Sequence, residues 1–442
     1  MHLACTKVRR AISTTLTVGI VVILVIVALG GYYYYTTTTP STSTTTTTNT
    51  TTTTSAYSGP TVIKIGMTQP LSGTFAEDGT MSLDGIKLWA KNVNASGGIY
   101  VSSLGRKLPV QLIYYDDGSN TATVATDYAN LASQGVNFLI APYSSPLTLA
   151  AAPIAEEHHI LLLDHGGASA SIFAKGYKYT VEILGLAPNY MIPVLQMLQN
   201  LNSSRPLKVA LFYGNDAFSI SVVQGAAAYI SAHSSAFSVV YNETYTETAS
   251  SFTSQLSAIG ALKPDVLIGG AHFADGETIM KNIQSLGLHF NMTALLVAPD
   301  DVHFQSDLGT LANGVVAPSQ WEANLDFTHF SGYYGNITGS QFVSQFEAAF
   351  PSEGAPNYEA AEGYATGLTL QKGIADSGSL NSTVVRNQLS NENFYTFYGN
   401  FQINSAGAQI GHTLVAIQWQ SGAKQIVWPK GVETAKFLYP SP

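Results

Sequence analysis

The sequence has very little cysteine, and this shortage excludes several kinds of site. Its 442 residues include one cysteine, Cys5, which lies ahead of every segment with a folding pattern. A disulfide scaffold, a thiolate zinc site and a cysteine nucleophile in the folded part are therefore excluded. The chain is long enough for two or three domains.

Charged residues are also scarce. Lys, Arg, Asp and Glu make up 11% of the chain, whereas about 25% is usual in soluble domains. The net charge is -9, with 19 Lys and Arg. Nucleic-acid binding depends on such residues neutralising phosphates, so a nucleic-acid partner is not expected. A surface with few ion pairs should also keep its stability in an acidic exterior.

The N-terminal segment has the pattern of a membrane helix. Lys7, Arg9 and Arg10 precede an apolar run over 12–30, which tyrosines follow at 32–35. Nineteen residues at about 1.5 Å each nearly match a hydrocarbon layer of about 30 Å. We assign 1–35 to a signal or membrane anchor with the remainder outside the cell. A removed signal peptide is the alternative, and it also places the remainder outside.

Residues 36–59 predict a stalk, because they are mostly Thr and Ser and contain few apolar residues that could form a core. Acceptor triplets for N-linked sugar, which together with the outward topology suggest a glycoprotein, begin at Asn49, Asn94, Asn202, Asn242, Asn291, Asn336 and Asn381.

From Thr61 onward, short β-rich runs such as TVIKIGM, VNFLIAP and DVLIGG alternate with helical patterns. This alternation is typical of βαβ units, and hence of an α/β fold with parallel sheets. The strands are too many for one lobe of moderate size, so we expect two doubly wound, Rossmann-like lobes. Ligands of such sheets bind beyond the carboxyl ends of the strands.

Several segments also carry a resemblance to a known family. IKIGMTQPLSGTFAEDGTMSLDGIKLWAKNVNASGGI, QLIYYDDGSNTATVATDYANLASQGVNFLIAPYSS, YEAAEGYATGLTLQKGIADSGSL and YGNFQINSAGAQIGHTLVAIQWQSGAKQIVWP together resemble the branched-chain (Leu/Ile/Val-type) amino-acid binding proteins of ABC transporters. The resemblance runs from Val62 to about Pro429. KVRRAISTTL also resembles the signal of archaeal membrane-anchored binding proteins, in which a peptidase cuts between Ala11 and Ile12.

The resemblance implies the type I periplasmic-binding-protein fold, with two lobes, three crossovers and one small solute between them. It divides the external part into 60–184 (first lobe), 185–299 (second lobe), 300–402 (first lobe again) and 403–442 (second lobe and C-terminal end).

The resemblance also implies a carboxylate clamp on the first lobe. Tyr143, Ser144, Ser145 and Thr148 follow the strand VNFLIAP and open a helix, where hydroxyls and free N–H groups favour an anion. Ordinary helix capping is the alternative for these residues.

A second part of the clamp follows the next strand. Gly167, Ala168 and Ser169 come after ILLLDHG, and the paired glycines let the backbone approach a ligand closely.

The second lobe should supply an aromatic side chain and a carboxylate for the ammonium group. Phe218 follows the strand LKVALFY, and it is a ligand contact or a packing residue of its helix. Glu247 and Asp275 are rival partners of the ammonium, and each is alternatively a loop residue or a helix cap. Asp78 corresponds to a position on the pocket floor in relatives, and Trp321 is predicted as an apolar wall or a core residue.

The enzyme and metal interpretations are weaker. His165–Gly166–Gly167 resembles an esterase oxyanion loop, but the chain has no G-x-S-x-G nucleophile elbow. Asp116 and Asp117 fit a turn better than an acid–base pair. We therefore expect no enzymatic activity, no metal and no cofactor.

These observations predict a solute-binding protein at the cell surface that delivers an amino acid to the permease and ATPase of an importer. A solute-sensing ectodomain for a partner signalling protein and a stalked adhesin are the alternatives. The adhesin would bind no small molecule.

Overall fold

The computed structural model describes residues 59–442 apart from 202, 247 and 248. Two compact units, Met1–Gly59 and Pro60–Pro442, divide the chain, and the second is described below. The predicted anchor, the predicted stalk up to residue 58, the acceptors Asn49 and Asn202, and Glu247 lie outside the described residues. Among the residues described, no helix is both long and apolar enough to cross a bilayer.

The first sheet is parallel throughout and has the strand order β4-β1-β5-β6-β7. Its strands are β1 (Ile63–Gln69), β4 (Val110–Asp116), β5 (Phe138–Ile140), β6 (Leu162–Asp164) and β7 (Thr180–Glu182). Its helices are α2 (Ala76–Ala95), α3 (Thr121–Ser133), α4 (Ser145–Glu157) and α5 (Ala170–Phe173). These elements alternate along the chain as the sequence predicted.

The second sheet has the order β16-β15-β12-β11-β10-β8-β9, and β15 and β16 are antiparallel to their neighbours. Its strands are β8 (Leu207–Gly214), β9 (Phe237–Tyr245), β10 (Val266–Gly270), β11 (Met292–Leu295), β12 (Val316–Ser319), β15 (Val415–Gln420) and β16 (Ala423–Trp428). Its helices are α6 (Ile192–Gln199), α7 (Ala217–Ala232), α8 (Thr253–Leu262), α9 (Phe273–Ser285) and α10 (Val302–Leu308).

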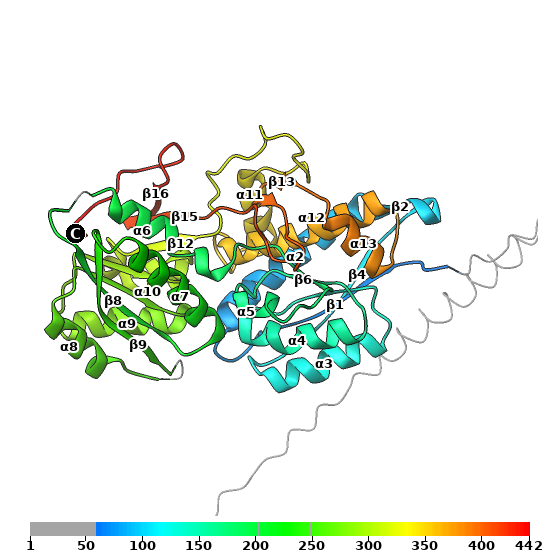
Figure 1. Cartoon of the computed structure of the whole chain (residues 1–442). Helices are drawn as coiled ribbons and strands as arrows, with labels where there is room; N and C mark the ends of the chain where they lie inside the picture. Colours follow the sequence, from blue (N-terminus) through cyan, green and yellow to red (C-terminus); the bar gives the residue numbers. More distant parts are fainter. Residues whose placement is uncertain (1–58, 202, 247–248) are drawn as a thin grey trace, which may run out of the picture. The chain divides into compact units, whose positions relative to one another are not determined.

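A third segment returns to the first sheet before the chain enters β15. It contains α11 (Gly339–Ala349), α12 (Tyr358–Ser377), α13 (Ser382–Leu389), β13 (Phe394–Thr396) and β14 (Gly399–Phe401). A small hairpin of β2 (Ile99–Val101) and β3 (Arg106–Leu108) flanks the same lobe. Figure 1 shows β1, β4 and β6 with these helices, and β8, β9 and β12 gathered separately.

One predicted boundary differs from the strand pairing. We assigned 300–402 to the first lobe, yet β12 pairs with β11 and β15 in the second sheet. The return to the first lobe therefore follows Ser319. From here on, the first lobe means the first sheet with α2–α5 and α11–α13, and the second lobe means the second sheet with α6–α10.

Helices α2 and α12 pack closely, although they are far apart in sequence. A Cβ at Gly85 would overlap the carbonyl oxygen of Ala360, and one at Gly363 would overlap that of Ser82. Only glycine permits this approach of two backbones. Helix α12 is buried within the first lobe, and its residues Glu359 and Glu362 are both 0% exposed.

The two lobes touch at the carboxyl ends of their strands. The hydroxyl of Tyr143, at the start of α4, lies 3.0 Å from Nδ1 of His272, which precedes α9. The Ala170 N–H donates to Oγ of Ser221 on α7 at 3.2 Å. These contacts place the two lobes in a closed arrangement.

Candidate functional site

Between the lobes lies a pocket to which both contribute. The cavity that remains between its walls is small, about 10 Å³, which is roughly the room that one water molecule needs. Its walls are formed by Tyr143, Ser144, Gly166, Leu184, Tyr190, Phe218, His272, Tyr358 and Glu362.

The topology explains why these residues meet. Tyr143 and Ser144 follow β5, Gly166 follows β6 and His272 follows β10, so all lie at the carboxyl ends of parallel strands. Phe218 sits in the first turn of α7, where Oδ1 of Asp216 accepts its N–H at 2.7 Å. The pocket thus occupies the place where open α/β sheets bind ligands.

The predicted clamp residues lie together on the first lobe. The Ser169 N–H donates to Oγ of Ser145 at 3.0 Å, which joins the loops after β5 and β6. Ser145 and Ser169 are both buried and, like Ala168, lie beside the pocket walls without being part of them. Tyr143, Ser144 and Phe218 of the predicted set line the pocket directly.

An internal carboxyl occupies part of the predicted clamp. Oδ1 of Asp164 accepts the N–H groups of Gly166 and Gly167 at 3.2 and 2.7 Å, and it lies 3.4 Å from the Thr148 hydroxyl. Burial raises the pKa of the Asp164 carboxyl to about 7. Gly167 is therefore engaged by Asp164, and the Thr148 hydroxyl donates to the Pro142 carbonyl at 3.0 Å. Sequence reasoning did not anticipate either contact.

Ser144 is the clamp residue best placed to meet a solute. Its side chain does not cap α4, and its buried Oγ has no hydrogen-bond partner among the described residues. Ser144 also lies at the N-terminal end of a 13-residue helix, which favours negative charge. This corner of the pocket can hold a carboxylate or a carbonyl oxygen.

Asp275, one of the two predicted acidic residues of the second lobe, does not line the pocket. Asp275 accepts the His272 N–H at 2.8 Å and the hydroxyl of Tyr245, so it fixes the start of α9. Asp275 therefore caps helix α9, which was the alternative interpretation of this residue. Glu247 lies outside the described residues.

Trp321 and Asp78 also differ from prediction. The Trp321 indole donates to the carbonyl of Phe397 at 3.0 Å and packs against Phe342 in the first lobe's core, so the pocket-wall prediction does not match its position. Asp78 is 1% exposed behind the pocket wall, and neither of its carboxyl oxygens has a hydrogen-bond partner among the described residues.

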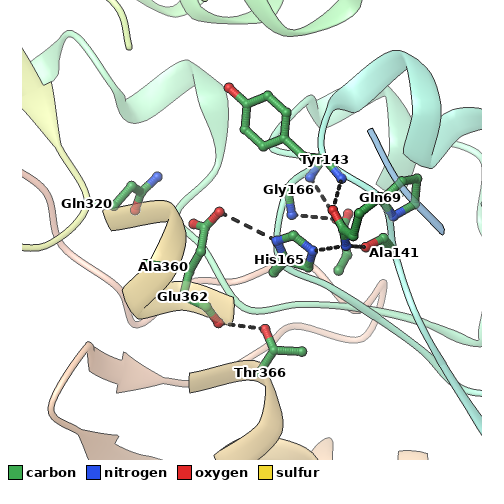
Figure 2. Close-up of polar contacts among 12 residues, drawn as sticks. Gln69, Ala141, Tyr143, His165, Gly166, Gln320, Ala360, Glu362 and Thr366 are labelled. Atoms are coloured by element: carbon green, nitrogen blue, oxygen red, sulfur yellow. Dashed lines mark hydrogen bonds and ion pairs between the residues drawn. The ribbon is translucent and has the colours of Figure 1, made fainter. Parts of the chain in front are cut away.

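Glu362 is a pocket residue that sequence reasoning missed. Figure 2 shows its carboxyl facing His165, whose ring bonds to Gln69 on the far side. Its Oε1 lies 3.7 Å from His165 Nδ1, and its Oε2 accepts the hydroxyl of Tyr398 at 3.1 Å. The available signal was the pair Glu359 and Glu362 in the first half of a helix, where no other residue is charged.

Burial controls the protonation of these groups. It raises the pKa of the Glu362, Glu359 and Asp78 carboxyls well above their usual range, and neighbouring carboxyls add to the effect. Burial lowers the pKa of His165 to about 4. The pocket wall is therefore close to neutral in the absence of a charged ligand.

A separate group of possible metal ligands lies where the lobes meet. Donor atoms of Glu77, Asp301 and His303 lie within 4.8 Å of one another. His303 Nδ1 contacts the Glu77 and Asp301 carboxylates at 2.9 and 3.0 Å, and hydrogen bonds and charge raise the pKa of His303 to about 9. With the imidazole protonated, His303 pairs with both carboxylates, and the three residues form an ion-paired cluster.

Comparisons with known proteins agree with this architecture. The family model of the periplasmic binding proteins matches residues 62–424. A Leu/Ile/Val-binding protein homolog from Brucella abortus is 21% identical over 391 residues, which cover 86% of this chain and 94% of the relative. A leucine-specific-binding protein from Salmonella typhimurium is 24% identical over 156 residues, or 35% of this chain and 40% of the relative.

Solved structures share the fold at low identity. The branched-chain amino acid transporter substrate binding protein of Streptococcus pneumoniae, in complex with isoleucine, matches with a TM-score of 0.70 and 19% identity, covering 83% of this chain and all of that one. A solute binding protein from R. palustris in complex with benzoate matches with a TM-score of 0.69 and 19% identity, covering 86% and 97%.

The matching family is one of solute binding and transport and is in general not enzymatic. Two doubly wound sheets, the three passages between them and the pocket at their strand ends agree with the type I fold of these binding proteins. The chain belongs to the periplasmic binding protein family and is a solute-binding protein related to the Leu/Ile/Val-binding proteins.

Proposed function

We propose that this chain is the external solute-binding protein of an ABC importer, and that it carries an amino acid, branched-chain or related, to the permease. The observation that carries the proposal is the pocket itself, whose walls come from both lobes at the carboxyl ends of their strands. Such a pocket can close around a small solute and release it when the lobes separate.

The closing step follows from which residues meet across the pocket. Tyr143 and Ser144 of the first lobe can hold the solute first, and Phe218 and His272 of the second lobe cover it on closure. The solute stabilises the closed form only through contacts that the open form lacks. The permease would then recognise the closed form.

The amino-acid assignment draws on the site and on relatives. Ser144 at the start of α4 suits a carboxylate, and the pocket offers aromatic walls for a side chain. The related proteins are named for leucine, isoleucine and valine. An aromatic carboxylate is a second candidate, because a protein of the same fold holds benzoate.

The N-terminal pattern supports a place at the cell surface. Residues 12–30 would anchor the chain and 36–59 would hold the binding part away from the membrane. A protease that attacks intact cells should therefore release the binding part into the medium, as followed by immunoblotting.

A thermal-shift screen of the full chain in detergent tests the binding function. The panel contains leucine, isoleucine, valine, their amides, benzoate and simple sugars. A true ligand at about 100 times its Kd should stabilise the protein by about 2.7 kcal/mol. Stabilisation by none of these compounds would favour the adhesin, and stabilisation by sugars alone would overturn the substrate class.

A further inference from the structure

Glu362 is the one carboxylic acid among the side chains that line the described pocket. It projects from α12, is 0% exposed, and has one oxygen bound by the Tyr398 hydroxyl. Its other oxygen, Oε1, has no hydrogen-bond partner among the described residues. A buried carboxyl oxygen without a partner costs free energy, which a ligand donor would recover.

The neighbouring hydrogen bonds fix which atom of His165 faces Glu362. Gln69 accepts the Tyr143 N–H through Oε1, so its NH₂ group faces Nε2 of His165 at 2.9 Å. Nε2 must then accept, and the single ring proton of neutral His165 sits on Nδ1. That proton points toward Glu362 at 3.7 Å, which is too long for a hydrogen bond.

The surroundings of Glu362 contain no compensating cation. None of the described residues that line the pocket is Lys or Arg. Besides the pocket's tyrosines and His272, the titratable groups that face or electrostatically couple to Glu362 are His165, Tyr398, Asp78, Asp164, Asp300 and Glu359. These groups cannot neutralise a Glu362 carboxylate, so the ionised form requires a positive charge from the ligand.

Apart from the Ser144 hydroxyl at the start of α4, the pocket walls offer few donors that are free to bind an anion. The N–H groups of Gly166 and Gly167 already bind Asp164. The pocket walls carry the rings of Tyr143, Tyr190, Tyr358 and Phe218, whose faces attract cations rather than anions.

We propose that Glu362 binds the cationic nitrogen of the solute, so that the ligand is a small organic amine, amino acids included. This inference rests on the proposed solute-binding function. When the ammonium binds, Glu362 gives its proton to solvent, and a carboxylate–ammonium pair replaces the neutral acid. Neither Glu247 nor Asp275 is needed for this contact.

Proton release gives the pair a pH dependence. Burial raises the pKa of Glu362, so the free protein holds this proton in mildly acidic solution. Affinity for an amine should therefore rise with pH until Glu362 ionises in the free protein. The rise approaches tenfold per pH unit when one proton is released.

Titration calorimetry on the full chain in detergent tests the proposal with three matched probes at pH 5, 6 and 7. Leucine carries both charges, 3-methylbutylamine lacks the carboxylate, and 4-methylpentanoate lacks the amine. We expect leucine and the amine to bind, with affinity that rises with pH, and 4-methylpentanoate to bind at least tenfold more weakly than leucine.

Glu362→Gln should reduce the affinity for the amine at least tenfold and remove its pH dependence. Glu359→Gln is the matched control, because Glu359 lies on the same helix, is equally buried and does not line the pocket. It should change affinity less than threefold. If Glu362→Gln fails to fold, two measurements on the unaltered protein still test the role of Glu362. One is the pH dependence of its affinity for the amine, and the other is the proton release on binding, measured in two buffers.

The outcomes separate the two proposals. Tighter binding of 4-methylpentanoate or benzoate than of leucine, or affinity that falls as pH rises, overturns the role of Glu362 while solute binding stands. Unchanged affinity in Glu362→Gln also overturns it. No binding by any probe or panel compound overturns both.

Discussion

Nδ1 of His303 lies 2.9 Å from Oε1 of Glu77, and this ion pair joins the start of α10 in the second lobe to the start of α2 in the first. Asp301, in the turn before α10, holds the same nitrogen at 3.0 Å. Because these carboxylates favour the imidazolium, the pKa of His303 rises to about 9. The pair therefore stays charged at neutral pH and favours the closed arrangement.

Replacing His303 should shift the lobes toward an open arrangement. Both side chains are more than one-third exposed, so the pair contributes at most about 1 kcal/mol, or roughly fivefold in the opening equilibrium. His303→Ala should increase the radius of gyration measured by small-angle scattering. Raising the pH of the unaltered protein above about 9 should act in the same direction.

Lys281→Ala provides the control for this measurement, because Lys281 pairs with Glu277 within α9 and this pair does not connect the two lobes. Its scattering should match that of the unaltered protein. Identical scattering from His303→Ala across the pH range would show that the pair has no part in closure.

Because several carboxyls are buried, we expect the folded protein to be more stable in mild acid than at neutral pH. The pKa of Asp164 rises to about 7 and that of Asp117 to about 6, mainly through burial, and burial also raises the pKa of Glu182. Unfolded carboxyls ionise near pH 4, so unfolding releases protons between about pH 4 and 7. The stability that these carboxyls contribute is present in acid and is lost as pH rises through their folded-state pKa values.

Two buried histidines act in the opposite direction. Burial lowers the pKa of His165 and His412 to about 4, so their unfolded forms bind protons between about pH 6.5 and 4. The raised carboxyls, including Glu359 and Glu362, outnumber them. The sequence alone predicted that stability would change little in acid, whereas the structure predicts that stability increases.

Calorimetry should therefore give a higher Tm at pH 5 than at pH 7. Each net proton released on unfolding contributes about 1.4 kcal/mol per pH unit. Asp164→Asn keeps an oxygen for the Gly166 and Gly167 N–H groups but cannot titrate, so it should flatten the dependence. Asp307→Asn, at an exposed position on α10, should leave it unchanged. A Tm that falls between pH 7 and pH 5 would contradict this assignment.

The sequence predicted the parallel sheets well because local patterns encode them. The run VNFLIAP contains β5 and DVLIGG contains β10, and each is short, apolar and followed by a polar strand end. The rule that ligands bind at strand ends directed attention to the edge of the sheets where Tyr143, Ser144 and Phe218 line the pocket.

Glu362 escaped prediction because its burial depends on a distant partner. A charged residue three positions after another on a helix usually lies on a solvated face. Only the packing of α12 within the first lobe, where Glu362 meets His165 and Tyr398, turns that face inward. Likewise, no local pattern shows that Asp164 turns back to bind the N–H groups of Gly166 and Gly167.

A partly buried ion cluster joins β16 to two segments beside β11 and β12. Nζ of Lys424 contacts Oδ1 of Asp300 at 3.3 Å and Oε1 of Glu322 at 3.1 Å, and it donates to the Asp300 carbonyl at 2.7 Å. The two carboxylates raise the pKa of Lys424. Oδ2 of Asp300 accepts the Tyr358 N–H at 3.0 Å, which connects this cluster to the start of α12.

Lys424→Met should destabilise the protein by about 3–5 kcal/mol, because it leaves the buried Asp300 carboxyl and the partly buried Glu322 carboxyl without their cation. Urea unfolding measures this loss. Lys281→Met removes an exposed partner instead and should cost less than about 1 kcal/mol. Since Asp300 also holds the first residue of the helix that carries Glu362, Lys424→Met should weaken solute binding as well. A loss no larger than that of Lys281→Met would show that Asp300 and Glu322 are stable as neutral acids without the ammonium.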